Sequence, residues 1–381
     1  MPATLHVLQV LPALNTGGVE RGTIEMARAI VEAGGQALVA SAGGRLVPEL
    51  ERVGGRHVTL PLASKNPLTI WRNAGLLTDL VHSNDITLVH ARSRAPAWSA
   101  LLAARRSAAR FVTTWHGVYS EDFPFKRHYN AVMGKGERVI AISRFVAERL
   151  RTQYGVEEER LRIVPRGVDI DSFDPARIAP ERVARLARDW GLAADRPASR
   201  PIVMLPGRVT RWKGQDVLVE AFGRMANRDA LCVLVGGHGA RDDYARSLAQ
   251  QAEALGIADR VRLVGDCADM PAALILADIV VSASTKPEPF GRVVIEAQAM
   301  HRPVIAPDHG AAVETIRQGE TGWRVPPNDP RALADALDRA LTMSASERAA
   351  MGQRAATDVV RQGYTTAAMC AATLGVYREL L

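Results

Sequence analysis

Short apolar runs alternate with amphipathic stretches along almost the whole chain, and this alternation limits the possible folds more than any other feature. In the first half, the runs at 5–11, 86–92 and 110–116 are each followed by residues with helical spacing of apolar side chains. Such alternation is typical of a parallel, doubly wound sheet with helices on its faces. The pattern restarts at Pro201, after a stretch at 171–200 that is rich in Pro, Asp and Arg.

The sequence therefore predicts an α/β protein with two Rossmann-like domains. A chain of 381 residues is too long for one ordinary core, so two domains are expected on length alone. The first domain is placed at 1–195 and the second at 200–364, and the last residues, 365–381, are expected to form a helix.

Composition indicates a globular protein of a reducing compartment. Hydrophobic residues make up 47% of the chain and charged residues 23%, as in ordinary globular domains. Three widely separated cysteines form neither a disulfide framework nor a metal-binding pattern. The N-terminus lacks a basic leader, and no run approaches the ~20 apolar residues of a spanning helix. A cytoplasmic location is expected.

The net charge of +7 is concentrated between residues 92 and 151. Aromatic residues are interleaved with the basic ones there: Trp98, Trp115, Phe123, Phe125 and Tyr129. One interpretation is an ordinary solvated, Arg-rich surface. The other is a face for anionic lipid or phosphorylated glycan, giving a peripheral contact with the inner face of the membrane. Nucleic acid is not expected, because no recognition motif accompanies the charge.

The stretch at 277–299 predicts an anion site. A buried strand is followed by a short loop that contains Glu288, and a helix then begins near Gly291. A helix N-terminus at the end of a strand offers free N–H groups and the positive end of a dipole to an anion. Glu288 and Glu296 would flank that anion, where carboxylates can accept hydrogen bonds from sugar or ribose hydroxyls.

Two cations follow the first strand of the second domain. Arg208 and Lys213 lie between Gly207 and Gly214, and two cations at one strand end suit a diphosphate. Surface charge is the alternative. A second flexible loop, at 236–239, lies at another strand end and is a weaker candidate for the phosphate pocket.

Candidates in the first domain are a histidine and a glycine pair. His116 ends a predicted strand, where ligands of open α/β sheets bind, although a lone histidine is more often structural; His90 has a similar position and a weaker claim. Gly17 and Gly18 occupy the first strand–helix loop, where they either approach a ligand or form a turn. The pattern is not G-x-G-x-x-G, which disfavours a nicotinamide-dependent oxidoreductase.

No metal site is expected. Asp169 and Asp171 form a D-x-D pair, but they lie in a segment near the linker with no further ligand evident, so a structural role is expected. No His, Cys and Asp cluster elsewhere has metal-binding spacing.

Together these motifs resemble glycosyltransferase family 4, whose members are retaining, nucleotide-sugar-dependent enzymes of GT-B fold. The central match is E-x7-E, from Glu288 to Glu296. Further matches, in the same order along the chain, are GGVE at 17–20, TWHG around His116, AISRF around Ser143, VPRGVDIDSFDP at 164–175 and GRVTRWKG at 207–214. The resemblance implies two Rossmann-like domains that face each other across a cleft, with the final helix crossing back onto the first domain.

The resemblance also implies a role for each matching residue. Arg208 and Lys213 would bind the donor diphosphate, Glu288 the sugar hydroxyls and Glu296 the ribose. The other donor-site residues it implies are Gly17 and Gly18, which would close over the donor, His116, which would contact the sugar and help to orient attack, Val264 and Gly265 near the base, and Phe290, Gly291, Arg292 and Val293 at the distal phosphate and sugar. Arg292 departs from the apolar residue common in the family.

The function that follows is a metal-independent, cofactor-free hexosyltransferase. It would transfer a hexose, with retention, from a nucleotide-diphosphate sugar to a glycan or glycolipid. The motif sequences most resemble those of enzymes that build lipopolysaccharide core or related envelope glycans. Capsule or exopolysaccharide synthesis and glycosylation of another lipid are alternatives in the same class. A non-catalytic nucleotide-sugar-binding protein is the alternative from a different class.

Overall fold

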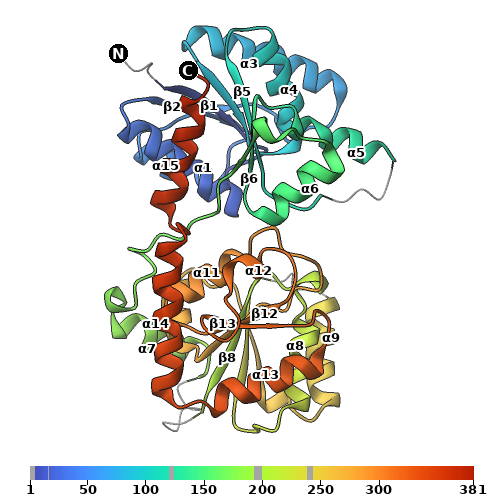
Figure 1. Cartoon of the computed structure of the whole chain (residues 1–381), viewed down its shortest axis with the longest axis vertical. Helices are drawn as coiled ribbons and strands as arrows, with labels where there is room; N and C mark the ends of the chain where they lie inside the picture. The colour runs from blue at the N-terminus through green and yellow to red at the C-terminus, as the bar shows by residue number, and fades with distance from the viewer. Residues whose placement is uncertain (1–4, 16, 120–123, 193–199, 238–242) are drawn as a thin grey trace. The chain divides into compact units, whose positions relative to one another are not determined.

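The chain folds into two compact units, each built around one parallel sheet (Figure 1). The structure is a computed structural model that describes residues 5–15, 17–119, 124–192, 200–237 and 243–381. The first unit consists of residues 1–166 and 366–381, and the second of residues 167–365.

The sheet of the first unit has seven parallel strands in the order β3-β2-β1-β4-β5-β6-β7. The strands are short and mostly buried, since helices cover both faces of the sheet, and their bounds are β1 His6–Val10, β2 Gln36–Ser41, β3 Arg56–Thr59, β4 Leu88–Ala91, β5 Arg110–Trp115, β6 Arg138–Ala141 and β7 Leu161–Ile163. Strand order reverses between β1 and β4, which pair directly with Val7 opposite Leu88. Ligands of such sheets bind beyond the carboxyl ends of the strands at this reversal.

Side-chain N-caps fix the start of two helices in the first unit. The Asn66 side chain accepts from the Leu68 N–H, and the Ser143 side chain accepts from the Val146 N–H, so each caps the helix that follows. The helices are α1 Gly18–Glu32, α2 Val47–Arg52, α3 Pro67–Ser83, α4 Arg94–Arg105, α5 Pro124–Asn130, α6 Arg144–Tyr154 and the C-terminal α15 Thr366–Arg378.

The second unit repeats the topology with six parallel strands in the order β10-β9-β8-β11-β12-β13. Its strands are β8 Ile202–Pro206, β9 Leu231–Val235, β10 Val261–Gly265, β11 Ile279–Val281, β12 Val304–Pro307 and β13 Gly322–Val325. Here the order reverses between β8 and β11. Strand β13 was not expected from the sequence, because its four residues begin with a glycine and include an arginine.

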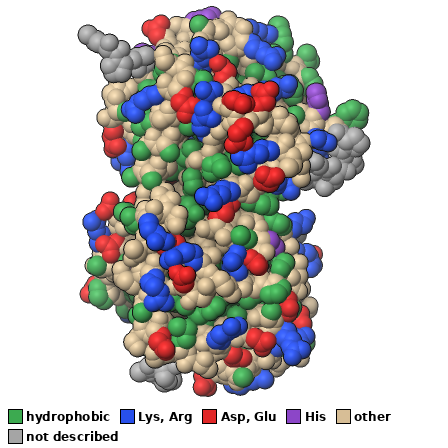
Figure 2. Space-filling model, in the orientation of Figure 1, with side chains coloured by type: hydrophobic (Ala, Val, Ile, Leu, Met, Phe, Trp, Pro, Cys, Tyr) green, Lys and Arg blue, Asp and Glu red, His purple; other side chains and the backbone are tan. Residues whose placement is uncertain are grey.

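The helices of the second unit are α7 Pro180–Asp189, α8 Gln215–Arg224, α9 Asp243–Ala254, α10 Met270–Leu276, α11 Arg292–Ala299, α12 Ala312–Thr315, α13 Pro330–Thr342 and α14 Ala345–Arg361. The start of α14 is fixed by a reciprocal capping box between Ser344 and Glu347. The charged side chains on the face drawn in Figure 2 mix both signs, with Lys and Arg interspersed among Asp and Glu. That face therefore has no large patch of a single charge sign.

The boundary between the units lies earlier than the sequence suggested. It falls after residue 166 rather than near 195. Helix α7, which was assigned to the first domain, belongs to the second because Arg182 makes a bidentate ion pair with Asp269 of that unit, at 2.9 and 2.7 Å. Val183 and Leu186 also pack on the core of the second unit. The final helix, α15, lies in the first unit.

His90 fastens α15 to the sheet of the first unit. Its imidazole is fully buried, and its two ring nitrogens contact the Tyr377 hydroxyl at 2.6 Å and the Thr114 hydroxyl at 2.7 Å. Burial lowers the pKa of His90 well below its ordinary value, and the nearby Arg92 cation lowers it further. His90 is thus a neutral structural residue. Both of its ring nitrogens contact hydroxyls of the protein, so its contacts do not support the ligand-binding role considered for it.

Replacing His90 with Leu tests this role through pH. The pKa of His90 is lower in the folded chain than in the unfolded chain. As pH falls below about 6.5, His90 is therefore protonated in the unfolded chain but stays neutral in the folded chain. His90 thus stabilises the fold above that pH, and this contribution is lost as pH falls below it. At about pH 7.5, His90→Leu should cost about 1–3 kcal/mol for each hydroxyl left unpartnered. The difference from wild type should then narrow by up to about 1.4 kcal/mol for each pH unit below about 6.5.

Urea denaturation over this pH range measures the difference. His82→Leu, at an exposed position on α3, is the control and should keep the pH dependence of wild type. A difference between wild type and His90→Leu that stays constant with pH would contradict a buried, neutral His90.

Candidate functional site

The candidate site of the second unit lies where its strand order reverses, between β8 and β11. The loop after β8 carries Arg208 and Lys213, and the loop after β11 carries Glu288. These strands are neighbours in the sheet, pairing Ile279 with Val203. Lys213 and Glu288, which are 75 positions apart in the chain, are thus brought to one edge. This is the edge at which open α/β sheets bind ligands.

Lys213 and Glu288 form a close ion pair at this edge. Lys213 Nζ lies 2.6 Å from Glu288 Oε1, and the two side chains are 17% and 15% exposed. The Ser284 hydroxyl donates to the same carboxylate oxygen, and the Lys213 ammonium lies 4.3 Å from the centre of the Trp212 ring. The pair is thus partly withdrawn from water and held from both loops.

Two glycines bring these loops together. Gly214 has φ 69°, and a Cβ added there would lie 2.0 Å from the Ala283 carbonyl oxygen, so only glycine lets the β8 loop approach the β11 loop. Gly310 has φ 61°, and a Cβ there would lie 2.5 Å from the Glu288 carbonyl oxygen. The loop after β12 therefore packs directly against the backbone of Glu288, which Ala311 N–H also contacts at 3.0 Å.

Helix α11 begins at this edge, as expected, with Gly291 as its N-cap. The Arg292 side chain reaches toward the next turn of the helix, with its Nε 3.2 Å from Glu296 Oε1. Each of the two glutamates of the motif is therefore paired with a cation, Glu288 with Lys213 and Glu296 with Arg292. The first-turn N–H groups of α11, at Arg292 and Val293, remain available to an anion.

The side chain of Phe290 lies away from this edge. It is 4% exposed and makes an edge-on contact with the Tyr364 ring, with centroids 5.7 Å apart. Only the backbone of Phe290 remains for a ligand. This residue anchors the β11 loop in the core.

Arg208 and the loops after β9 and β10 occupy the same edge. Arg208 is exposed, and its carbonyl oxygen accepts from the buried Gln215 amide at 3.0 Å. Gly236 N–H donates to the carbonyl of Gly265, which ends β10 directly after Val264. The loop candidate at 236–239 is described up to Gly237, and its residues 238 and 239 lie outside the described residues.

The first unit places a neutral histidine beside two buried arginines. Burial lowers the pKa of His116 well below its ordinary value, and the Arg92 and Arg166 cations lower it further. His116 Nε2 is buried and, among the described residues, has no hydrogen-bond partner. A neutral imidazole with an unused ring nitrogen can donate to or accept from a sugar hydroxyl, depending on its tautomer.

Arg92 belongs to the same edge of the first sheet, directly after β4. It is 3% exposed, and its Nη1 donates to Gln9 Oε1 at 3.1 Å. Its Nε is buried with no partner among the described residues. Burial lowers the pKa of Arg92, although an arginine stays charged.

Gly17 and Gly18 open α1 at the reversal point of the first sheet. Arg166 donates to the Gly18 carbonyl, and the Glu20 carboxylate lies beside Gly17, where a Cβ would be 2.5 Å from its Oε2. The role of this pair in closing over a donor stays a prediction.

The D-x-D pair, Asp169 and Asp171, lies in a local turn. The Asp169 carboxylate accepts from the Asp171 N–H at 3.1 Å and from the Ser172 hydroxyl at 2.7 Å, so it closes a local turn. Across the described part of the chain, no group of three or more His, Cys, Asp or Glu side chains is placed to hold a metal ion.

The sequence did not point to Ser284 or to the Arg292–Glu296 pair. Ser284 lies four residues before Glu288, a signal too common to single out. The i, i+4 spacing of Arg292 and Glu296 was visible, but the resemblance assigned Arg292 to the distal phosphate and sugar of the donor.

Comparisons with known proteins agree with this geometry. The model of Glycosyltransferase Family 4 matches residues 16–172, and the model of Glycosyl transferases group 1 matches residues 193–358. A GDP-mannose-dependent alpha-(1-6)-phosphatidylinositol monomannoside mannosyltransferase of Mycolicibacterium smegmatis is 31% identical over 278 residues, which are 69% of this chain and 69% of that protein.

A D-inositol 3-phosphate glycosyltransferase of Xylanimonas cellulosilytica is 35% identical over 251 residues. The match covers 65% of this chain and 58% of that protein, so the chain spans less than two thirds of this relative. The crystal structure of a glycosyltransferase from Rickettsia africae superposes with a TM-score of 0.90 and 38% identity, covering 99% of this chain and 98% of that one. Two parallel-sheet Rossmann-like domains are the GT-B architecture, so the expected fold is confirmed.

Proposed function

Because this chain belongs to the family 4 glycosyltransferases, we propose that it transfers a hexose from a nucleotide-diphosphate sugar to a glycan or glycolipid acceptor, with retention at the anomeric carbon and without a metal ion. The observation that carries the proposal is the Lys213–Glu288 pair at the reversal point of the second sheet.

The pair supplies the two kinds of contact that a nucleotide sugar requires. The Lys213 ammonium and the exposed Arg208 suit the diphosphate, and the N–H groups at the start of α11 suit its distal phosphate. Glu288 suits the sugar hydroxyls, since a carboxylate accepts hydrogen bonds and repels phosphate. In the ligand-free pair each charge satisfies the other, and a bound donor would exchange this contact for its own.

The chemistry follows from charge separation. Breaking the anomeric C–O bond leaves positive charge on the sugar and negative charge on the diphosphate. Lys213, Arg208 and the first turn of α11 stabilise that negative charge, and the leaving phosphate oxygen takes the proton of the attacking acceptor hydroxyl on the same face. The two cations take the charge-neutralising role that a metal ion would otherwise fill, which is why the proposal includes none.

Arg292 gives the donor site a feature of its own. It holds Glu296, the carboxylate proposed to bind the ribose, at 3.2 Å. Glu296 can keep this cation and still accept from a ribose hydroxyl, because a carboxylate has about four lone-pair positions. The pair therefore orients Glu296 without occupying it.

His116 is proposed to contact the donor sugar from the first unit. Its depressed pKa keeps it neutral at physiological pH, so it positions a hydroxyl through a hydrogen bond without adding positive charge near the forming oxocarbenium. Gly17 and Gly18 are proposed to close over the donor, and Val264 and Gly265 to lie near its base.

The acceptor and the pathway are the broadest part of the proposal. Lipopolysaccharide core or a related envelope glycan is proposed, with capsule, exopolysaccharide or another lipid as alternatives, and a cytoplasmic location. Lipid glycosylation is favoured by the relative from Mycolicibacterium smegmatis, which is described as acting on phosphatidylinositol monomannoside with GDP-mannose as donor.

A peripheral membrane contact is proposed with a revised set of residues. Trp115 is buried, and Trp98 is tied to the Tyr129 carbonyl at 3.3 Å, so the aromatic side chains of the stretch 92–151 are largely used in packing. Phe125 is 87% exposed, and Leu68 and Trp71 on α3 are 78% and 66% exposed. Phe123 lies outside the described residues. Within the described chain, no helix is both long and apolar enough to span a bilayer.

Donor binding can be measured directly. In a thermal-shift screen of UDP-, GDP- and ADP-sugars, the true donor at about 100 times its dissociation constant should stabilise the chain by about 2.7 kcal/mol. Lys213→Ala should lower the rate of sugar transfer, or of slow hydrolysis of the nucleotide sugar, by about 10²–10³-fold. This is the effect seen in other enzymes when one group that stabilises the charge of the transition state is removed. Arg339→Gln, an exposed change of the same charge on α13, is the control and should leave the rate unchanged.

Tight donor binding with no turnover across a panel of acceptors would favour the non-catalytic alternative, a nucleotide-sugar-binding protein. Unchanged turnover in Lys213→Ala would show that sugar transfer does not take place at this edge of the sheet.

Membrane contact is tested by flotation with anionic vesicles. Trp71→Ser should weaken vesicle binding by about tenfold or more, because burying one large apolar side chain contributes about 1.5–3 kcal/mol. Val360→Ser removes an exposed apolar side chain from α14 of the other unit and serves as the control. Equal binding of both variants would place the contact elsewhere.

A further inference from the structure

The carboxylate of Glu288 receives two hydrogen bonds on one of its oxygens. Lys213 Nζ donates to Oε1 from the β8 loop at 2.6 Å, and the Ser284 hydroxyl donates to the same Oε1 from the β11 loop. The other oxygen, Oε2, has no hydrogen-bond partner among the described residues and is not fully buried. Glu288 therefore has one occupied oxygen and one open oxygen.

The open oxygen lies beside the start of α11. A Cβ added to Gly291, the N-cap of this helix, would be 3.8 Å from Glu288 Oε2. The first-turn N–H groups of α11 suit the distal phosphate of a donor, which is the phosphate that carries the sugar. An oxygen beside them is well placed for a hydroxyl of that sugar, because an ionised carboxylate only accepts hydrogen bonds.

The backbone around Glu288 has little freedom to move. Glu288 lies between Pro287 and Pro289, and a residue that precedes a proline is largely confined to extended conformations. A Cβ at Gly310 would be 2.5 Å from the Glu288 carbonyl oxygen, which accepts from Ala311 N–H at 3.0 Å. The direction of the carboxylate therefore depends on its side-chain torsions, which the hydrogen bonds to Oε1 hold.

Ser284 and Lys213 differ in their freedom to leave Glu288. Ser284 is fully buried and lies four residues before Glu288 in the same loop, so its hydroxyl stays beneath the surface that a ligand would contact. Lys213 has a long, flexible side chain that is 17% exposed, and its ammonium also lies 4.3 Å from the centre of the Trp212 ring. An anionic ligand can therefore draw Lys213 away, whereas Ser284 remains.

A bound diphosphate would bring negative charge close to Glu288. Like charges a few ångströms apart repel, so the carboxylate would be pushed away from the phosphates once Lys213 has left it. A hydrogen bond from a buried hydroxyl opposes this movement, and it adds no second cation that would compete with the phosphates for the carboxylate. Ser284 supplies such a bond to Oε1 and leaves Oε2 open.

We propose that Ser284 is a positioning residue for recognition of the transferred sugar. It holds Oε1 of Glu288 after Lys213 has turned to the diphosphate, so that Oε2 stays directed at a sugar hydroxyl. The inference rests on the proposed function, because it takes Glu288 to bind the sugar of a nucleotide-sugar donor. Ser284 acts through Glu288 and contacts neither sugar nor phosphate itself.

Calorimetric binding to the full-length chain tests this role with three pairs of probes: UDP and UDP-glucose, GDP and GDP-mannose, and ADP and ADP-glucose. For the pair that wild type binds most tightly, the dissociation constant of the nucleoside diphosphate is divided by that of the nucleotide sugar. This ratio reports on the sugar alone. Ser284→Ala should keep the affinity for the nucleoside diphosphate within about twofold of wild type and should lower the ratio by about tenfold, as expected when one hydrogen bond to a charged group is lost.

A double-mutant cycle separates positioning of Glu288 from a general effect on the loop. In a Glu288→Ala background, which has no carboxylate left to orient, Ser284→Ala should change the ratio by less than about twofold, because the effects of coupled residues do not add. Ser284→Cys keeps the shape of the side chain with a weak donor, and it should lower the ratio as Ser284→Ala does. This variant carries the test if Ser284→Ala fails to fold.

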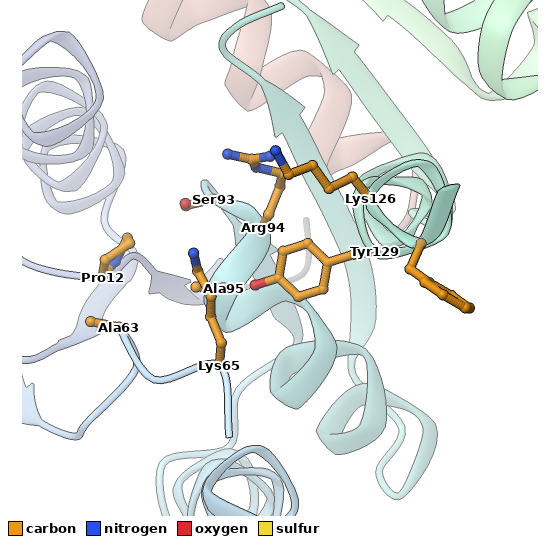
Figure 3. Close-up of a pocket in the computed structure, with 9 residues that line it drawn as sticks. Pro12, Ala63, Lys65, Ser93, Arg94, Ala95, Lys126 and Tyr129 are labelled. Atoms are coloured by element: carbon orange, nitrogen blue, oxygen red, sulfur yellow. The ribbon is translucent and has the colours of Figure 1, made fainter. Parts of the chain in front are cut away.

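Two other serines provide matched controls. Ser282→Ala makes the same change two residues earlier, directly after β11. Ser93→Ala makes it at the start of α4 in the first unit, where Ser93 lines a cavity of about 660 Å³ and its side chain does not cap the helix (Figure 3). Both variants should keep the ratio of wild type.

An equal loss of affinity for both probes of the pair in Ser284→Ala, or the same fall of the ratio in the Glu288→Ala background, would overturn the proposal and leave Ser284 as a support of the loop. A ratio that Ser284→Ala leaves unchanged would overturn it too. In each of these cases donor binding by wild type would leave the proposed function standing. A wild-type chain that binds none of the probes would refute the proposed function, and the role of Ser284 with it.

Discussion

The ion pair between Lys213 and Glu288 is the contact on which the candidate site of the second unit depends. It joins the loops after β8 and β11 across the point where the sheet reverses its order. Gly214 makes it geometrically possible, since a side chain there would clash with Ala283 and drive these two loops apart. Gly310 lets the loop after β12 pack against the backbone of Glu288. The pair keeps two partly buried charges satisfied, and it holds in one place the cation and the carboxylate that we propose to bind a nucleotide sugar.

The two units use one topology for different chemistry. Both sheets reverse order after their first strand, and both gather functional side chains at the carboxyl edge there. In the second unit Lys213 and Arg292 each have a carboxylate partner at that edge. In the first unit the edge carries the buried Arg92, whose hydrogen bond is to a neutral glutamine.

The sequence predicted the two parallel sheets because buried parallel strands are read directly as apolar runs. It missed β13, which is too short and too polar to stand out, and it placed the boundary near 195 instead of after 166. The boundary was misplaced because α7 is attached to the second unit by a tertiary contact. The Arg182–Asp269 pair joins residues far apart in the chain, and the sequence does not show it. Motif spacing brought Lys213 and Glu288 to one site, but it could not show that they contact each other or that Arg292 binds Glu296. Such choices among partners depend on side-chain geometry.

The central claim is that Lys213 binds the diphosphate and Glu288 the sugar, and that a donor replaces their mutual contact with its own. Calorimetric affinities for the nucleoside diphosphate and for the nucleotide sugar, in wild type, Glu288→Gln and Lys213→Met, test this most directly. Glu288→Gln should bind the nucleoside diphosphate at least as tightly as wild type, because Lys213 is released, and should lose the additional affinity that the sugar gives. Lys213→Met should bind both ligands about tenfold or more weakly. An equal loss of affinity for both ligands in Glu288→Gln would contradict the division of roles at this site.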